Sequence, residues 1–295
     1  LVTLNTLIHD DEYPRAYALA HDLYKVGVDA LIIQDLNLLQ YDLPPIRLHA
    51  STQCDNRTAE QVIHLQELGF RRVVLARELS IEEIKTIHKA VSETITTNQP
   101  SIELEAFVHG AMCISYSGRC LLSNYLVNRD ANRGECAQPC RWEYAIMEVK
   151  RDGMYFPIQD SKEGTYILNS KDMCMIEHIP ELVECGIDSF KIEGRVKSAY
   201  YTAVTANAYK SEVNAYLENP DGYKFNPQSL EVLESVSHRR YGTGYFFDTP
   251  IESAQIAEEG GYIREKAFLA TVEDYDAESG RCTLLQSFRV SLRSH

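Results

Sequence analysis

The sequence predicts an α/β protein, either a (β/α) barrel or a doubly wound sheet. Short apolar runs alternate with helical stretches through the first half of the 295-residue chain, as they do when helices join parallel strands. These runs are almost continuously Val, Ile and Leu, which is typical of parallel strands covered on both faces. The composition, 44% hydrophobic and 24% charged, is that of an ordinary globular protein.

Six parallel strands are expected, at residues 2–6, 29–35, 46–51, 71–77, 102–110 and 188–194. Helices are expected near residues 13–26, 57–68, 81–94, 175–186 and 198–217. Eight strands close a (β/α) barrel, and six usually do not. Either the sheet is open, or the chain lacks the first two βα units of a barrel.

The regular alternation stops after residue 110. A cysteine-rich segment (110–174) follows, with an added strand after its densest cysteine run, and the last βα unit then completes a main unit of residues 1–217. Residues 218–227 are rich in Pro, Gly and Asn and are expected to be a linker. Beyond them we expect a small, partial C-terminal β segment, so that 218–295 forms the second part of the chain.

Five cysteines follow an uneven spacing of C-x6-C-x15-C-x3-C, with the last one further on. They are Cys113, Cys120, Cys136, Cys140 and Cys174. The chain opens with no basic, signal-like region and has no apolar run of the roughly 20 residues that cross a bilayer, so a cytoplasmic protein is expected. Thiols in that compartment more often bind metal than form disulfides. The spacing favours a 4Fe–4S cluster, with zinc and unligated thiols left open.

The net charge of −14 argues against a generally basic nucleic-acid binder. Residues 113–151 nevertheless hold six Lys or Arg side chains against four acidic ones. This local excess is compatible with a polyanionic partner, although it is small.

The segment EAFVHGAMCISYSGRCLLS (105–123) resembles the signature of the peptidase U32 family. The likeness continues through RGECAQPCRW, GTYILNSKDMC, FKIEGRVKSAYY and SHRRYGTGYF, so it covers most of the chain. The nearest branch is that of the tRNA hydroxylation proteins, which are also called collagenase-like proteases. The resemblance implies a TIM-like (β/α) barrel that here lacks its first two βα units, and the C-terminal residues depart from the family pattern.

The resemblance also implies a function. Members of this branch carry a 4Fe–4S cluster and support hydroxylation of the wobble uridine of tRNA at C5, a reaction linked to prephenate. Matching positions make Cys113, Cys120, Cys136 and Cys174 the expected ligands, with Cys140 as the alternative to Cys174. The expected partners are therefore tRNA and prephenate, with no membrane.

Other candidate residues lie at strand ends, which form the active-site rim of a barrel. The expected catalytic residues are His49, Glu105, His109, Lys191 and Glu193. The expected substrate-binding residues are Arg77, Arg195, His238, Arg239, Arg240 and Tyr241. Glu105 and His109 are four residues apart on one strand and are expected to face the same way. For each of these side chains, a structural ion pair or hydrogen bond is the competing interpretation.

Two other functions compete with hydroxylation. A peptidase is the historical label of the family, but the chain has no H-E-x-x-H motif and no G-x-S-x-G nucleophile elbow. Clustered thiols are also a poor arrangement for one activated nucleophile. The third function is a non-catalytic Fe–S or zinc scaffold that binds RNA. The sequence therefore favours an RNA-modifying enzyme over a peptidase, and a peptidase over a scaffold.

Overall fold

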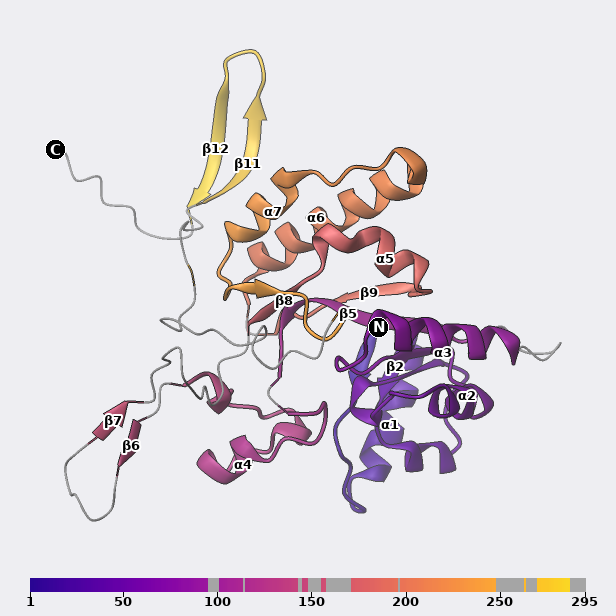
Figure 1. The fold of residues 1–295 in the computed structure, drawn as a ribbon. Coiled ribbons are helices and arrows are strands. Elements are labelled where there is room, and N and C mark those ends of the chain that lie inside the picture. The colour runs from indigo at the N-terminus through magenta and orange to yellow at the C-terminus, as the bar shows by residue number, and fades with distance from the viewer. Residues whose placement is uncertain are drawn as a thin grey trace.

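The computed structural model describes residues 1–94, 101–113, 115–142, 145–147, 155–157, 171–195, 197–247, 263 and 270–286. It shows a mixed α/β fold around a mostly parallel sheet (Figure 1). All six expected strands are parallel neighbours: β1 (Val2–Leu4), β2 (Ala30–Ile33), β3 (Arg47–Ala50), β4 (Arg72–Val74), β5 (Glu103–Ala111) and β9 (Ser189–Ile192). The α/β class is confirmed, and closure into a barrel that lacks two units stays a prediction.

Helices connect these strands and cover one side of the sheet. They are α1 (Tyr13–Lys25), α2 (Ala59–Glu67), α3 (Ile81–Glu93), α5 (Ile179–Glu184), α6 (Ala199–Glu218) and α7 (Pro227–Glu234). Three of them begin at a hydroxyl side chain, Thr58, Ser80 or Ser198, which accepts a hydrogen bond from a backbone N–H of the first turn. These caps explain why the helices begin where the sequence pattern predicts.

The sheet has one apolar face and a second face that also carries charged and polar side chains. One set of alternate strand residues belongs to the buried core beneath the helices: Ala50, Val73 and Leu104. Their sequence neighbours point to the opposite face: His49, Arg72 and Glu105. Parallel strands are usually apolar on both faces. The second face, called the polar face below, departs from this pattern because it carries ionisable side chains.

Strand β5 changes its surroundings at a bulge. Phe107 pairs with Lys191 of β9 while His109 pairs with Ile192, so β5 carries one extra residue between them. Beyond the bulge, the end of β5 pairs antiparallel with β8 (Asp172–Cys174), and β8 pairs with β10 (Tyr241–Gly242). The expectation that Glu105 and His109 face the same way is wrong, because the bulge interrupts the alternation and gives them entirely different partners.

The chain beyond the expected linker returns to the main body. Leu233 of α7 and Phe246 belong to the same apolar core as the sheet, and the carbonyl of Phe246 accepts a hydrogen bond from the N–H of Ile81 at 2.9 Å. Residues 218–227 therefore connect two parts of one core. No helix within the described ranges is long and apolar enough to cross a bilayer.

Two hairpins form small sheets of their own. The first, β6 (Ala145–Met147) with β7 (Tyr155–Pro157), includes the strand expected after the cysteine run. The second, β11 (Ala270–Asp276) with β12 (Arg281–Gln286), is the expected C-terminal β stretch. The other residues between Trp142 and Lys171, and most of those from 248 to 269, lie outside the described residues.

Candidate active site

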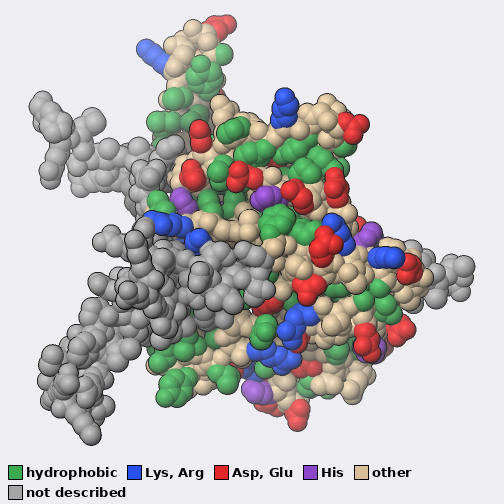
Figure 2. Space-filling model, viewed as in Figure 1, with side chains coloured by type: hydrophobic (Ala, Val, Ile, Leu, Met, Phe, Trp, Pro, Cys, Tyr) green, Lys and Arg blue, Asp and Glu red, His purple; other side chains and the backbone are tan. Residues whose placement is uncertain are grey.

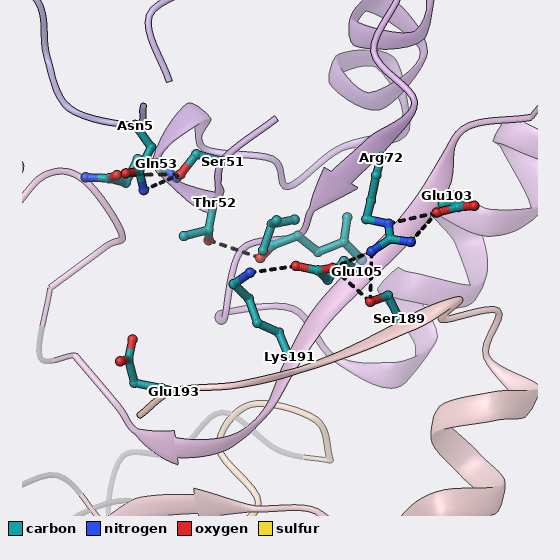
Figure 3. A network of polar contacts seen from close by, with 12 residues as sticks. Asn5, Ser51, Thr52, Gln53, Arg72, Glu103, Glu105, Ser189, Lys191 and Glu193 are labelled. Carbon is teal, nitrogen blue, oxygen red and sulfur yellow. Dashed lines mark hydrogen bonds and ion pairs between the residues drawn. The ribbon is translucent and has the colours of Figure 1, made fainter. Parts of the chain in front are cut away.

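Glu105 is the centre of a polar network on the polar face (Figure 3). One carboxylate oxygen accepts a hydrogen bond from Lys191 Nζ at 2.7 Å. The other accepts from Arg72 Nη1 at 3.0 Å and from Ser189 Oγ at 2.8 Å. Arg72 also reaches Glu103, to which its Nε donates at 2.7 Å. Three neighbouring strands, β4, β5 and β9, therefore converge on one buried carboxylate.

The network keeps Glu105 ionised. Burial alone would raise the pKa of this carboxyl, but the charge and hydrogen bond of Lys191, together with Ser189 and Arg72, lower its pKa overall. A carboxylate with a lowered pKa and partners on both oxygens is a poor proton acceptor at neutral pH. The geometry suits holding Lys191 in place better than accepting a proton.

His49 lies beside this network on β3, paired with Arg72 in the sheet. Burial, and then the charge of Arg72, lower the pKa of its imidazole. Its Nδ1 atom is buried and has no hydrogen-bond partner among the described residues. His49 is therefore neutral at physiological pH, and it can give or take a hydrogen bond without carrying charge.

Arg77 joins the polar face to the cysteine-rich segment. Its guanidinium donates to Glu193 Oε2 at 3.2 Å and to the sulfur of Cys113 at 3.3 Å. It also stacks over the ring of Phe107, 3.8 Å from the centroid, and Lys191 Nζ lies 5.7 Å from the same ring. Two cations thus lie close to one aromatic ring of β5, near the C-terminal ends of β4 and β9.

Arg195 extends this connection. Its backbone N–H donates to Glu193 Oε1 at 2.7 Å, and its guanidinium donates to the carbonyl of Gly134. On the other side, Arg133 binds the carboxylate of Glu12 at 2.7 Å. The segment around Gly134 therefore contacts the sheet and helix unit at two points, through Arg195 and through Arg133. Arg195 itself is exposed, and one of its terminal guanidinium nitrogens makes that contact.

Four of the five candidate cysteines are neighbours in space. The pKa of Cys140 is raised, chiefly by burial; Arg141 opposes the rise, and the nearby thiols of Cys113, Cys136 and Cys120 add to it. Four thiols in one region form the donor set of a 4Fe–4S cluster. In the described part of the chain, however, no three Cys, His, Asp or Glu side chains meet at the spacing of metal ligands. The chemistry of the donor set fits such a cluster, while the ligand geometry is not formed.

Cys174 lies in a different environment from these thiols. It pairs with His109 across β8 and β5, and its sulfur is 3.9 Å from the hydroxyl of Tyr209. Burial is the main reason that the pKa of Cys174 is raised to about 11. As a ligand, Cys174 would have to be reached by the cysteine-rich segment, whereas Cys140 already lies among the other three thiols.

His109 sits in an aromatic pocket. The rings of Tyr209 and Tyr241 are each centred 5.4 Å from its imidazole, and Tyr201 is 6.0 Å away. Burial lowers the pKa of His109 to about 3. Its Nε2 atom is buried without a partner among the described residues. His109 is neutral and separated from the Glu105 network.

The predicted substrate-binding run at 238–241 is mostly turned inward. His238 is buried and stacks on Tyr241 at 4.6 Å. The backbone N–H of buried Arg239 donates to Asp172 at 3.1 Å, and the hydroxyl of Tyr241 donates to the carbonyl of Leu233 at 3.0 Å. Arg240 is the exposed member of the four. This run supports β8 and the His109 pocket and offers no open aromatic face to RNA.

Sequence reasoning missed Arg72, Ser189 and Tyr209. Arg72 precedes Val73 in the alternation, so its place on the polar face could have been found from the apolar pattern of RRVVLAR. Ser189 is two residues before Lys191 and shares its face for the same reason. Tyr209 comes from the middle of α6, and no local pattern links it to His109 or Cys174.

Comparison with known proteins places these residues in a family. A family model described as peptidase family U32 matches residues 1–255. A 23S rRNA 5-hydroxycytidine synthase of Escherichia coli is 43% identical, over 74% of this chain and 31% of that protein. tRNA hydroxylation protein P1 of Bacillus subtilis is 35% identical, over 97% of this chain and 66% of its own length. An uncharacterized protease of Methanocaldococcus jannaschii is 39% identical, over 82% and 58% respectively. The chain thus spans between about one third and two thirds of these relatives.

Proposed function

The chain belongs to peptidase family U32, and we propose that it is an RNA-hydroxylating enzyme acting on tRNA. The proposed reaction is hydroxylation of the wobble uridine at C5, linked to prephenate. The observation that carries the proposal is the similarity to two relatives named for RNA hydroxylation or for a hydroxylated RNA nucleoside, one of them along nearly the whole chain. The proposed setting is the cytoplasm, where RNA substrates occur.

The polar face supplies the residues that would contact the substrate. Lys191 is a partly exposed cation of the site, and its Nζ atom lies 2.7 Å from Oε1 of Glu105. Arg77 lies over the ring of Phe107, close to which Lys191 also lies, and its guanidinium forms an ion pair with Glu193. Together they form a pair of fixed positive charges suited to a carboxylate of prephenate or a phosphate of RNA. In this arrangement Lys191 touches the substrate, and Glu105 and Glu193 position the cations.

The cysteines supply the redox part of the proposal. Cys113, Cys120 and Cys136 would hold a 4Fe–4S cluster, with Cys174 as the expected fourth ligand and Cys140 as the nearer alternative. Replacing the C5–H bond of uridine with C5–OH removes two electrons and adds an oxygen atom, so the reaction also needs an electron acceptor and an oxygen donor. A bound cluster would supply one-electron transfer toward that acceptor. The sulfur of Cys113 accepts a hydrogen bond from Arg77, so the thiols adjoin the two cations.

The cluster is tested by iron and acid-labile sulfide analysis after purification without oxygen. About four irons and four sulfides per chain are expected, lost in Cys113→Ala. Comparison of Cys174→Ala with Cys140→Ala assigns the fourth ligand, because the variant that keeps its iron is the one whose thiol is not needed. Stoichiometric zinc, or no metal at all, would contradict the redox proposal.

The RNA activity is tested in a bacterial strain that lacks its own tRNA hydroxylation proteins. Expression of the protein should restore 5-hydroxyuridine-derived nucleosides in total tRNA, measured by mass spectrometry, and removal of prephenate synthesis should abolish the signal. Lys191→Ala should lower it strongly, while Lys25→Ala, a matched change at an exposed ion pair, should not. Hydroxycytidine in 23S rRNA with unchanged tRNA would redirect the substrate assignment.

A peptidase is the second candidate, favoured by the relative named as a protease. Gelatin or casein hydrolysis by the purified protein, retained after Cys113→Ala and independent of iron, would support it. A non-catalytic scaffold that carries an Fe–S cluster or zinc is the third candidate. It predicts RNA binding with neither hydroxylated nucleoside nor peptide product.

A further inference from the structure

A short helix in the cysteine-rich segment presents an exposed mixed surface. The helix, α4 (Leu122–Val127), and its flanks leave apolar side chains open to solvent, with Tyr125 86%, Leu121 70% and Tyr116 55% exposed. Two exposed arginines and two exposed asparagines, Asn124 and Asn128, lie among them. We define the α4 surface as Tyr116, Arg119, Leu121, Asn124, Tyr125 and Arg129. Figure 2 shows hydrophobic side chains gathered where Figure 1 places α4.

The buried side of α4 explains why these residues face outward. Ser123 is fully buried, and its hydroxyl accepts a hydrogen bond from the N–H of Ala137 at 3.0 Å. Just beyond α4, Asn132 donates to the carbonyl of Cys120 at 3.1 Å. Because residues two apart on a helix point roughly 200° apart, anchoring Ser123 turns Tyr125 toward solvent. The exposure of Tyr125 is therefore fixed by the fold.

The charge of this surface distinguishes it from the rest of the chain. Between Cys113 and Arg129 there are two arginines and no aspartate, glutamate or lysine, in a protein with a net charge of −14. Exposed aromatic rings, arginines and amides match what unpaired RNA offers, namely base faces, phosphates and base edges. An acidic or purely apolar protein partner would not need all three features together.

The α4 surface begins close in sequence to the candidate active site. Its first residue, Tyr116, lies three positions after Cys113, whose sulfur contacts Arg77. The guanidinium of Arg57 lies over the ring of Tyr116, 4.7 Å from the centroid. The α4 surface therefore begins beside the residue through which the cysteine-rich segment contacts Arg77.

We propose that the α4 surface binds unpaired nucleotides of the RNA substrate next to the reacting base. Tyr125 stacks on a base, Arg119 and Arg129 contact phosphates, and Asn124 bonds a base edge. This inference rests on the proposed function, because it assumes that RNA is the substrate. It adds the place on the protein where RNA next to the target nucleotide is held.

The test is fluorescence anisotropy of a labelled RNA hairpin with an unpaired uridine-containing loop, with a blunt RNA duplex as competitor. Tyr125→Ala should weaken hairpin binding roughly 5- to 150-fold, the range measured for loss of one stacked base. Tyr125→Phe keeps the ring and should retain most of the affinity. Tyr24→Ala removes another exposed tyrosine, on α1, and should leave binding unchanged. A plot of log affinity against log salt concentration has a negative slope, and Arg119→Gln should make it shallower by about 0.7.

The outcomes separate this inference from the proposed function. If the unaltered protein binds no RNA, both fail. If it binds the hairpin and Tyr125→Ala binds equally well, the α4 surface is refuted while the RNA substrate stands. Sedimentation of the same variants detects the competing occupant. A dimer that Tyr125→Ala converts to monomer, with RNA affinity unchanged, would make this surface a contact between two copies of the chain and overturn the inference.

Discussion

Replacing Glu105 with alanine should destabilise the protein far more than the same change at Glu103, although both carboxylates bind Arg72. Glu105 is 4% exposed and accepts hydrogen bonds from Lys191, Arg72 and Ser189. Removing one partner of a buried ion pair costs about 3–5 kcal/mol, because the remaining charges are left in a poorly solvated place. The side chain of Glu103 is 50% exposed, and an exposed pair contributes about 0–1 kcal/mol.

The assay is urea unfolding at pH 7 followed by circular dichroism. Against a typical free energy of unfolding of about 5–15 kcal/mol, Glu105→Ala should shift the midpoint strongly and Glu103→Ala barely. Glu105→Gln keeps the shape of the side chain and should fall between them. Equal shifts for Glu105→Ala and Glu103→Ala would refute the reasoning that burial of the carboxylate, rather than its contact with Arg72, sets the magnitude.

The pH dependence gives a second check on Glu105. Its pKa is lowered in the folded protein, so the unfolded chain binds this proton more readily as the pH falls. The stabilisation is fully present above the ordinary glutamate pKa of about 4.3 and is lost as the pH drops through the lower, folded value. The stability difference between wild type and Glu105→Gln should therefore shrink below about pH 4. A difference that grows on acidification would mean that the carboxyl is protonated in the folded state.

Two further substitutions test other parts of the site. Gly110→Ala should lower the free energy of unfolding by about 2–4 kcal/mol, because φ at Gly110 is +106° and a Cβ there would collide with the backbone of Glu193. Gly27→Ala is also at positive φ but in open space, and it should cost only about 1 kcal/mol. Equal losses of stability in the two variants would show that the collision is relieved. Tyr209→Phe should lower the free energy of unfolding by about 1 kcal/mol, because the tyrosine hydroxyl donates to the carbonyl of Val108 at 2.9 Å. Thermal unfolding measures the effects of the glycine and tyrosine substitutions. An unchanged melting temperature in Tyr209→Phe would show that the hydroxyl does not stabilise the His109 pocket.

The sequence predicted the sheet well because the signal for parallel strands is local. The runs at DALIIQD and RRVVLAR carry their own apolar pattern, and all six strands pair as expected. The pairing of β8 with the end of β5 was not foreseen, because it joins residues more than sixty positions apart and places an antiparallel strand beside a parallel one. Contacts of that kind leave no periodicity in either segment.

The candidate site was likewise predictable where the signal is local and unpredictable where it depends on pairing between strands. Lys191 and Glu193 could be placed because they end a recognisable strand. The separation of Glu105 from His109 could not, since a bulge is a one-residue change of register that the alternation of EAFVHG does not reveal. The inward turn of His238 and Tyr241 was also hidden, because a basic and aromatic run looks the same in sequence whether it binds RNA or packs against a strand.

The two unlike faces of the sheet limit which length changes the chain can accept. Deleting one residue from the first half of β5 would exchange its faces, turning Leu104 toward the charged network and Glu105 toward the helices. The cysteine-rich segment is under a different constraint, because its contacts through Arg133 and Arg195 fix only a few points of a longer path. Insertions should therefore be tolerated among homologues between these fixed points and excluded from β3, β4, the first half of β5 and β9. In an alignment of homologues, these strands should therefore appear as segments without gaps.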